Sequence, residues 1–315
     1  MRNSAFPMIL ALAAVMTTCR AEDPMVDTFT VQLLSSQAVS GRWERAAQRG
    51  LVRIAAELDA DVSQVRVEDL EEARTLLDGQ RGSGVDLIFG VGAGVQKLLH
   101  AEAPAHPTTD FVLLPGDRYA DNVGGIQFLP EEAGFIAGAV AGAISPNRRV
   151  GLLRGEGQPW LIQLEEGFLA GFRSRQRRSE VETAEGPEGV TRLHEAGVRI
   201  ALYTCDHAEL EVLDAARDTG VLLVGTDLAQ MEARPETVVA AIDVDVAEAM
   251  LRVAREVRDR TFSGRVFAFD LGSGVLDVAV SATLGTDEMA AAQNALDEAR
   301  SEVTAGLVEF DELGL

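Results

Sequence analysis

Short apolar runs alternate with longer amphipathic stretches along most of this chain. Residues 28–34 and 86–91 are apolar runs rich in β-branched or aromatic side chains, a composition typical of strands. Between them, residues 43–58 place apolar side chains three or four positions apart, the spacing of an amphipathic helix. Strands that alternate with helices of about 10–15 residues predict βαβ units and parallel sheets.

The alternation starts again after Ser145, so the chain holds too many strands for one compact sheet and we expect two α/β lobes. Further strands are predicted at residues 65–67, 111–114, 123–128, 150–153, 198–204, 221–225, 266–269 and 275–281, and further helices at 131–144, 161–172, 208–219, 246–258 and 287–305. Ligands of open parallel sheets bind beyond the carboxyl ends of the strands. Two such sheets that face each other predict a ligand cleft able to close by a hinge motion.

The predicted helix at residues 131–144 is built largely from alanine and glycine. Its small residues recur at helical spacing, from Ala133 and Gly134 to Ala141 and Gly142. Side chains this small allow another backbone to approach closely. We therefore expect a tightly packed neighbour along this helix.

The first residues have the pattern of an export signal. Arg2 precedes an apolar stretch at residues 5–16, which is shorter than the ~20 residues that span a bilayer, and small residues then lead to Cys19. We expect residues 1–19 to form a lipoprotein signal peptide that ends at a lipidated Cys19. The alternative is an ordinary signal peptide with an incidental cysteine, because Met16 and Thr18 differ from the residues that lipoprotein signals favour.

Charge and composition exclude several classes of function. The chain has 50 acidic and 28 basic residues, a net charge of -22, and such a field repels phosphate backbones. We expect no nucleic-acid binding through a broad basic face. The 2 cysteines and 4 histidines are widely separated, so a metal site of ordinary ligand spacing is not expected. The sequence also has no P-loop and no GxSxG motif, and we expect neither a cofactor nor enzymatic activity.

A few residues are candidates for ligand contact. The turn GVGAG at residues 90–94 misplaces the third glycine of a dinucleotide-binding fingerprint, so we expect a tight turn that brings backbone amides, with Gly92, to the cleft. Trp43 and Trp160 each follow a strand and offer either a flat face for a ring ligand or ordinary packing. Asp117 and Asp227 lie near strand ends, where a carboxylate accepts hydrogen bonds from a ligand or caps a helix.

Two long segments carry a family resemblance. They are NVGGIQFLPEEAGFIAGAVAGAIS at residues 122–145 and RRVGLLRGEGQPWLIQLEEGFLAGF at residues 148–172. Shorter matching segments are VDLIFGVGAG at 85–94, FVLL at 111–114 and LLVGTDLAQ at 222–230. Together they resemble the basic membrane protein family, substrate-binding lipoproteins related to the purine-nucleoside receptors of ABC importers.

The resemblance implies a type I periplasmic binding protein fold, with two Rossmann-like lobes, a hinge of three crossovers and a ligand held between the lobes. It implies a first lobe of residues 27–130 plus about 246–281, and a second lobe of residues 131–245 plus about 282–315. It also implies export to the cell membrane or periplasm, a lipid anchor, and partnership with an ABC permease and ATPase.

The same resemblance implies ligand roles for individual residues. Trp43 matches the aromatic residue that stacks on the base, and Asp227 matches the acid that faces the ribose. Other positions depart from the family pattern. Glu44 stands where the family has asparagine, and Pro115 takes the place of an aspartate, with Asp117 two residues on.

In the second lobe, Thr204 and Cys205 replace a glycine pair, and Asp243 falls about where the family has a lysine. Because the overall resemblance is to nucleoside receptors, a nucleoside or similar small polar ring compound is the expected ligand class. The alternative is a sensory or interaction protein that keeps the fold and signals to a membrane partner.

Overall fold

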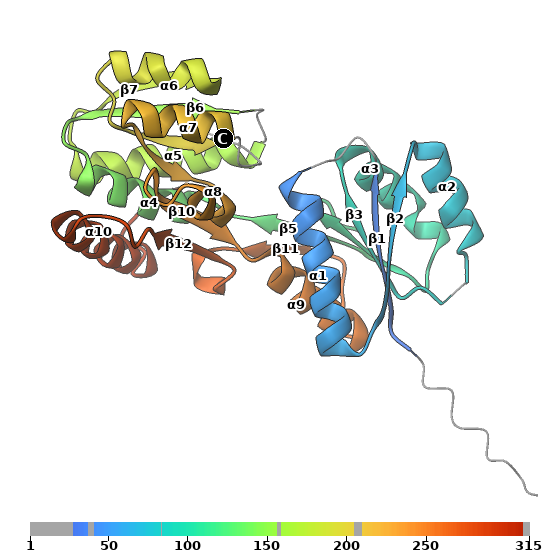
Figure 1. Cartoon of the computed structure of the whole chain (residues 1–315). Helices are drawn as coiled ribbons and strands as arrows, with labels where there is room; N and C mark the ends of the chain where they lie inside the picture. Colours follow the sequence, from blue (N-terminus) through green and yellow to red (C-terminus); the bar gives the residue numbers. More distant parts are fainter. Residues whose placement is uncertain (1–27, 37–40, 83, 156–158, 205–209, 311–315) are drawn as a thin grey trace, which may run out of the picture.

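The computed structural model describes residues 28–36, 41–82, 84–155, 159–204 and 210–310, and these form two sheets with helices around them (Figure 1). The first sheet has the strand order β11-β5-β4-β3-β1-β2, and the second has the order β12-β10-β9-β8-β6-β7. Neighbouring strands are parallel except β12, which runs antiparallel to β10. The predicted fold class, two α/β lobes with parallel sheets, is confirmed.

The first lobe follows the alternation expected from the sequence. Its elements are β1 (Thr30–Ser36), α1 (Arg42–Leu58), β2 (Asp61–Val67), α2 (Leu70–Gly79), β3 (Leu87–Val91), α3 (Ala93–Glu102), β4 (Asp110–Leu114) and β5 (Val123–Phe128). Helix α9 (Val246–Arg258) packs against α1, and β11 (Val266–Phe269) completes the sheet beside β5.

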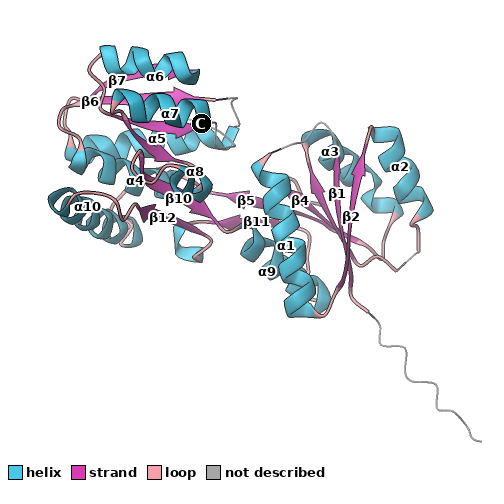
Figure 2. Cartoon of the chain, viewed as in Figure 1, coloured by secondary structure: helices cyan, strands magenta, loops and turns pink. Residues whose placement is uncertain are grey.

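The second lobe repeats the strand order of the first. Its elements are α4 (Glu131–Ile144), β6 (Arg149–Arg154), α5 (Pro159–Arg175), β7 (Glu180–Glu185), α6 (Gly186–Glu195), β8 (Ile200–Thr204), α7 (Leu210–Thr219), β9 (Leu222–Gly225), α8 (Leu228–Ala233), β10 (Val238–Val244), β12 (Leu276–Val280) and α10 (Thr286–Thr304). Helices flank the strands of each lobe (Figure 2).

One sequence-based boundary is wrong. We expected residues 246–281 to return to the first lobe, but β12 pairs with β10 in the second sheet. The chain passes from β11 through a short 3₁₀ turn, Leu271–Ser273, into the other lobe. The apolar run at residues 275–281 predicts a strand, but it does not indicate which strand will pair with it.

Three crossovers join the lobes: from β5 to α4, from β10 to α9, and from β11 to β12. Backbone hydrogen bonds link them, since Leu129 N–H donates to Phe269 O at 2.9 Å and Asp245 N–H donates to Val275 O at 2.8 Å. A single apolar cluster runs from the α1 side of the first sheet to the α4 side of the second. The hinge region that connects the lobes in Figure 1 therefore contains buried apolar side chains.

The alanine- and glycine-rich helix α4 packs directly on α5, as its composition suggested. A Cβ atom built on Gly138 would lie 1.9 Å from the Phe168 carbonyl oxygen of α5. In the reverse direction, a Cβ on Gly171 of α5 would lie 1.9 Å from the Phe135 carbonyl oxygen. Only glycine allows this backbone-to-backbone distance. In the described residues, no helix has both the length and the apolar character that crossing a membrane requires.

Candidate functional site

The carboxyl end of the first sheet holds a buried carboxylate. Glu44, in the first turn of α1, is 4% exposed. Its Oε1 accepts a hydrogen bond from the Ser35 hydroxyl at 2.9 Å, and its Oε2 pairs with the guanidinium of Arg66 at the end of β2. This group ties the start of α1 to the ends of β1 and β2.

Trp43 lies beside this group but is turned toward the hinge. The residue is 7% exposed, and its indole stacks on Phe128 at the end of β5, with ring centroids 5.3 Å apart. Phe128 in turn contacts Phe269 at the end of β11, with centroids 6.2 Å apart. Of the two roles considered for Trp43, this geometry favours packing, and it leaves little of the ring surface accessible to a ligand.

The glycine turn between β3 and α3 forms as expected. Gly92 adopts φ 101°, a left-handed conformation that favours glycine, and precedes the first residue of α3. Gln96 of the same helix donates from Nε2 to the carbonyl oxygens of Leu114 and Pro115, at 3.0 and 2.7 Å. These hydrogen bonds connect the first turns of α3 to the loop after β4. Asp117 lies in that loop and is exposed.

The second sheet carries a comparable ion pair at its carboxyl end. Arg154, the last residue of β6, donates from Nε and Nη2 to both oxygens of Glu165, at 2.6–3.1 Å. Glu165 belongs to α5 and is 8% exposed. Thr204, the last residue of β8, is buried, and its hydroxyl donates to Glu165 Oε1 at 3.4 Å.

Asp227 acts as the N-cap of the short helix α8. Its Oδ1 accepts a hydrogen bond from Ala229 N–H at 2.9 Å. Next to it, Thr226 N–H donates to the side-chain oxygen of the buried Gln230 at 2.8 Å. The helix-capping alternative for Asp227 is thus realised, and a contact with a ligand remains a proposal.

The structure places the six candidate ligand residues in two groups, one in each lobe. Trp43, Gly92 and Asp117 belong to the first lobe, and Thr204 and Asp227 to the second. Trp160 lies in the first turn of α5, where only its backbone is described. Cys19 and the predicted signal peptide, residues 1–19, lie outside the described residues.

Two carboxylates stand at the first crossover, at the start of α4. Burial raises the pKa of Glu131 and that of Glu132 above the ordinary glutamate value. Glu132 Oε2 accepts a hydrogen bond from Leu271 N–H, on the third crossover, at 3.1 Å. This contact joins two of the hinge segments through a side chain.

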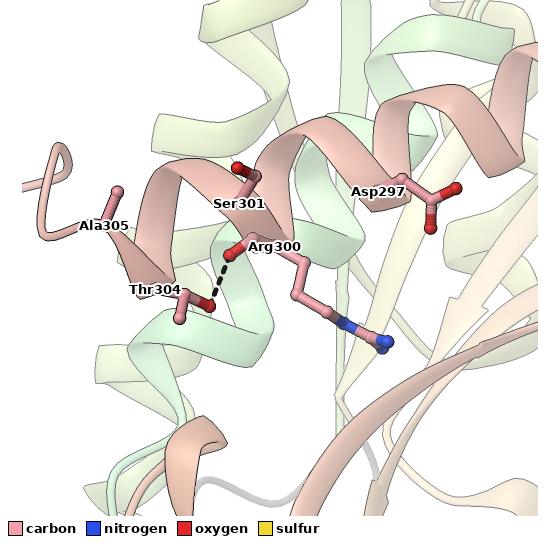
Figure 3. Close-up of a pocket in the computed structure, with 5 residues that line it drawn as sticks. All are labelled: Asp297, Arg300, Ser301, Thr304 and Ala305. Atoms are coloured by element: carbon pink, nitrogen blue, oxygen red, sulfur yellow. Dashed lines mark hydrogen bonds between the residues drawn. The ribbon is translucent and has the colours of Figure 1, made fainter.

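Two hollows in the described surface lie on helices, one on α10 and one on α1. One of about 450 Å³ is lined by Asp297, Arg300, Ser301, Thr304 and Ala305 (Figure 3). All five belong to α10 or directly follow it, and Arg300 is paired with Asp277. We assign it no ligand. Among the described residues no group of three or more histidine, cysteine, aspartate or glutamate side chains is placed to hold a metal ion.

Sequence reasoning missed Arg66, Arg154 and Glu165. Each lies in a segment whose secondary structure was predicted or adjoins one, yet the pairing of a strand-end arginine with a helix glutamate depends on three-dimensional proximity. A charged residue at the carboxyl end of a strand with an apolar centre, as Arg154 ends RVGLLR, is the signal that was available.

The comparisons with known proteins extend over most of the chain. The family model for PnrA-like ABC transporter substrate-binding proteins matches residues 40–304. The transcriptional activator protein Med of Bacillus subtilis is 22% identical over 246 residues, which cover 75% of this chain and 77% of that protein. Basic membrane protein A of Borreliella burgdorferi is 21% identical over 217 residues, 64% of either protein. A nucleoside-binding protein of an ABC transporter of Lactococcus lactis, BmpA, is 27% identical over 92 residues, 29% of this chain and 26% of that protein.

Solved structures show the same fold. A transcriptional activator of the comK gene from Bacillus halodurans superimposes with a TM-score of 0.75 at 22% identity, covering 88% of this chain and 98% of that one. A solute-binding protein of an ABC transporter system from Aeropyrum pernix gives a TM-score of 0.71 at 20% identity, covering 89% and 92%. Likeness at this identity establishes the architecture, and the family match establishes the lineage.

Proposed function

We propose, from the premise that this chain belongs to the family of PnrA-like ABC transporter substrate-binding proteins, that it binds a nucleoside or a similar small polar ring compound between its lobes. The family membership makes solute binding outside the cytoplasm, together with a permease and an ATPase, the general class of activity. The expected resemblance to the basic membrane protein family is thereby confirmed.

The observation that carries the proposal is the pair of matching sheets joined by three crossovers. Polar side chains gather at the carboxyl ends of both, around Glu44 in the first lobe and Glu165 in the second. Those ends are where open parallel sheets bind ligands. The nucleoside class is supported by the match of Asp227 to the family pattern and by a relative named as nucleoside-binding.

A thermal-shift screen of nucleosides, free bases and sugars tests this proposal. We expect a nucleoside or a related ring compound to raise the melting temperature, and calorimetric titration to give its affinity. Asp227→Ala should weaken binding by roughly 10- to 150-fold, because a hydrogen bond to a charged group contributes about 1.5–3 kcal/mol.

Asp69→Ala is the matched control for Asp227→Ala. Asp69 caps α2 in the first lobe by accepting hydrogen bonds from Glu71 N–H and Glu72 N–H, so both variants lose a helix cap. Only the Asp227 variant should lose affinity. A folded Asp227→Ala protein that binds as tightly as the wild type would rule out the ribose contact.

The lipid anchor is a second part of the proposal. If Cys19 is acylated, the protein fractionates with membranes, and a labelled fatty acid marks the wild type but not Cys19→Ala. Equal labelling of both proteins would contradict the anchor and favour an ordinary signal peptide.

A signalling role is the second candidate function. It is favoured by one observation: relatives named as transcriptional activators occur among both the sequence matches and the structural matches. Deleting the gene separates the roles. Loss of uptake of the identified ligand supports import, whereas unchanged uptake with altered transcription supports signalling.

A further inference from the structure

Arg154 is a cation at the carboxyl end of the second sheet. It ends β6, a strand that lies between β7 and β8 in the second sheet. Thr204 is its direct neighbour on β8 in the strand register. Arg66, the corresponding arginine of the first lobe, lies on β2 at the outer edge of its sheet.

The geometry of the Arg154–Glu165 pair holds one edge of the guanidinium and leaves the other edge outward. Nε donates to both carboxylate oxygens at 3.0 and 3.1 Å, and Nη2 donates to Oε2 at 2.6 Å. The side chain of Glu165 is 10% exposed, whereas that of Arg154 is 46% exposed. In the described part of the chain, no hydrogen-bond acceptor is found for the two hydrogens on Nη1, and Glu185, the neighbour of Arg154 on β7 in the strand register, acts on the guanidinium through its charge.

A guanidinium has five N–H donors in a rigid plane, and its planar fork matches the two oxygens of a carboxylate or phosphate. Holding one edge on a buried carboxylate removes most of the side chain's rotational freedom before a ligand arrives, so less entropy is lost on binding. The pair therefore has the form of a preorganised anion receptor at a position where ligands of such sheets bind.

The other end of β6 also carries an arginine, Arg149, but its ion pair is more exposed to solvent. Arg149 begins the same strand, is 45% exposed and pairs with Glu180, but Glu180 is itself 63% exposed. At Arg154 the partner is buried and receives a further hydrogen bond from Thr204. In a chain with a net charge of -22, a local cation favours the binding of an anion against the overall field.

We infer that the ligand carries an anionic group, a carboxylate or a phosphate, which is bound by the outer edge of the Arg154 guanidinium. This inference rests on the proposed function, since it names the charge of the polar ring compound bound between the lobes. Arg154 is then the residue that distinguishes an anionic ligand from its neutral counterpart.

Calorimetric titration with matched pairs of neutral and anionic compounds tests the inference. Guanosine with guanosine 5′-monophosphate, and uridine with uridine 5′-monophosphate, test a phosphate. Uracil with orotate, which is uracil bearing a carboxylate, tests a carboxylate. We expect the anionic member of at least one pair to bind about 10-fold or more tightly than its neutral partner.

The variants separate binding from folding. Arg154→Gln alone leaves Glu165 buried without its cation and is expected to destabilise the fold. The double variant Arg154→Gln with Glu165→Gln keeps two neutral hydrogen-bonding side chains of similar size, and it should fold while losing the preference for the anion. Arg149→Gln with Glu180→Gln, at the opposite end of β6, is the matched control and should keep it.

The outcomes distinguish this inference from the proposed function. If neutral members bind as tightly as anionic ones, or if the folded Arg154/Glu165 double variant keeps the preference for the anion, the inference is overturned and the proposed function stands. If no compound of any pair binds but the thermal-shift screen finds a neutral ligand, the inference alone is overturned, and if the screen finds no ligand either, both are overturned. A loss of preference in the double variant but not in the control supports the assignment of Arg154.

Discussion

At the scale of single residues, the burial of Trp43 decides what its replacement does. The indole packs on Phe128 and only 7% of the residue is exposed, so Trp43→Ala leaves a large cavity. We expect a loss of about 3–5 kcal/mol in the free energy of unfolding, measured by urea denaturation. Trp43→Phe keeps an aromatic ring against Phe128 and should cost much less. A Trp43→Ala protein as stable as the wild type would show that the ring is not part of the core.

Asp110 predicts a pH dependence of stability. Burial, and then the negative charge of Asp86, raise the pKa of Asp110 to about 6 in the folded protein. An unfolded aspartate has a pKa of about 3.9. The folded state therefore favours the protonated carboxyl, and this contribution to stability is complete below about pH 4 and is lost as the pH rises through 6.

Asp110→Asn mimics the protonated form, so its advantage over the wild type should grow between pH 4 and pH 8. We expect about 1 kcal/mol at pH 8, allowing for screening by solvent at this half-buried group, and a rise of a few degrees in Tm. Thermal unfolding at both pH values measures it. Asp121→Asn, at an exposed position before β5, should show no such growth, and equal behaviour of the two variants would contradict the argument.

At the scale of elements, the contact between α4 and α5 depends on the absence of side chains. A Cβ at Gly138 would lie 1.9 Å from a backbone oxygen that no rotamer change can move away. Gly138→Ala should therefore force the helices apart and lower the free energy of unfolding by at least the 1–3 kcal/mol that overpacking typically costs.

Gly79→Ala is the control for Gly138→Ala. Gly79 ends α2, and a Cβ added there would have nothing within 4 Å, so alanine should be neutral or slightly stabilising. Urea unfolding of both variants gives the comparison. Equal stability of the two would show that α4 and α5 can separate without cost.

Edge position explains why the hydrophobic pattern left out one strand and shortened another. β7 has the sequence EVETAE and was not predicted, and the prediction for β2 covered only residues 65–67 of Asp61–Val67. Both are outermost strands, with a neighbour on one side only, and several of their side chains are exposed. A strand with a solvated face does not need a continuous apolar run, so its sequence resembles a loop.

At the scale of the whole molecule, two lobes joined by three crossovers predict closure on ligand binding. Small-angle scattering should show a smaller radius of gyration when the strongest-binding compound of the screen is present at saturation. Asp227→Ala at the same compound concentration should stay closer to the unliganded value. An unchanged radius of gyration for the saturated wild type would argue against hinged closure.

Local periodicity was sufficient to predict most of the alternating strands and helices, the two lobes and the close neighbour of α4. These features follow from which side chains are apolar and small, and each depends on neighbours a few positions away in the sequence. The resemblance added the family, because its motifs are contiguous segments such as residues 122–145.

Only the tertiary structure decided which sheet received β12, that Trp43 packs on Phe128, and that Arg154 is held by Glu165. Each of these is a choice of partner between segments far apart or on different elements. An apolar or charged residue specifies the kind of partner it requires. The partner it meets is set by how the sheets and helices pack, which no local pattern records.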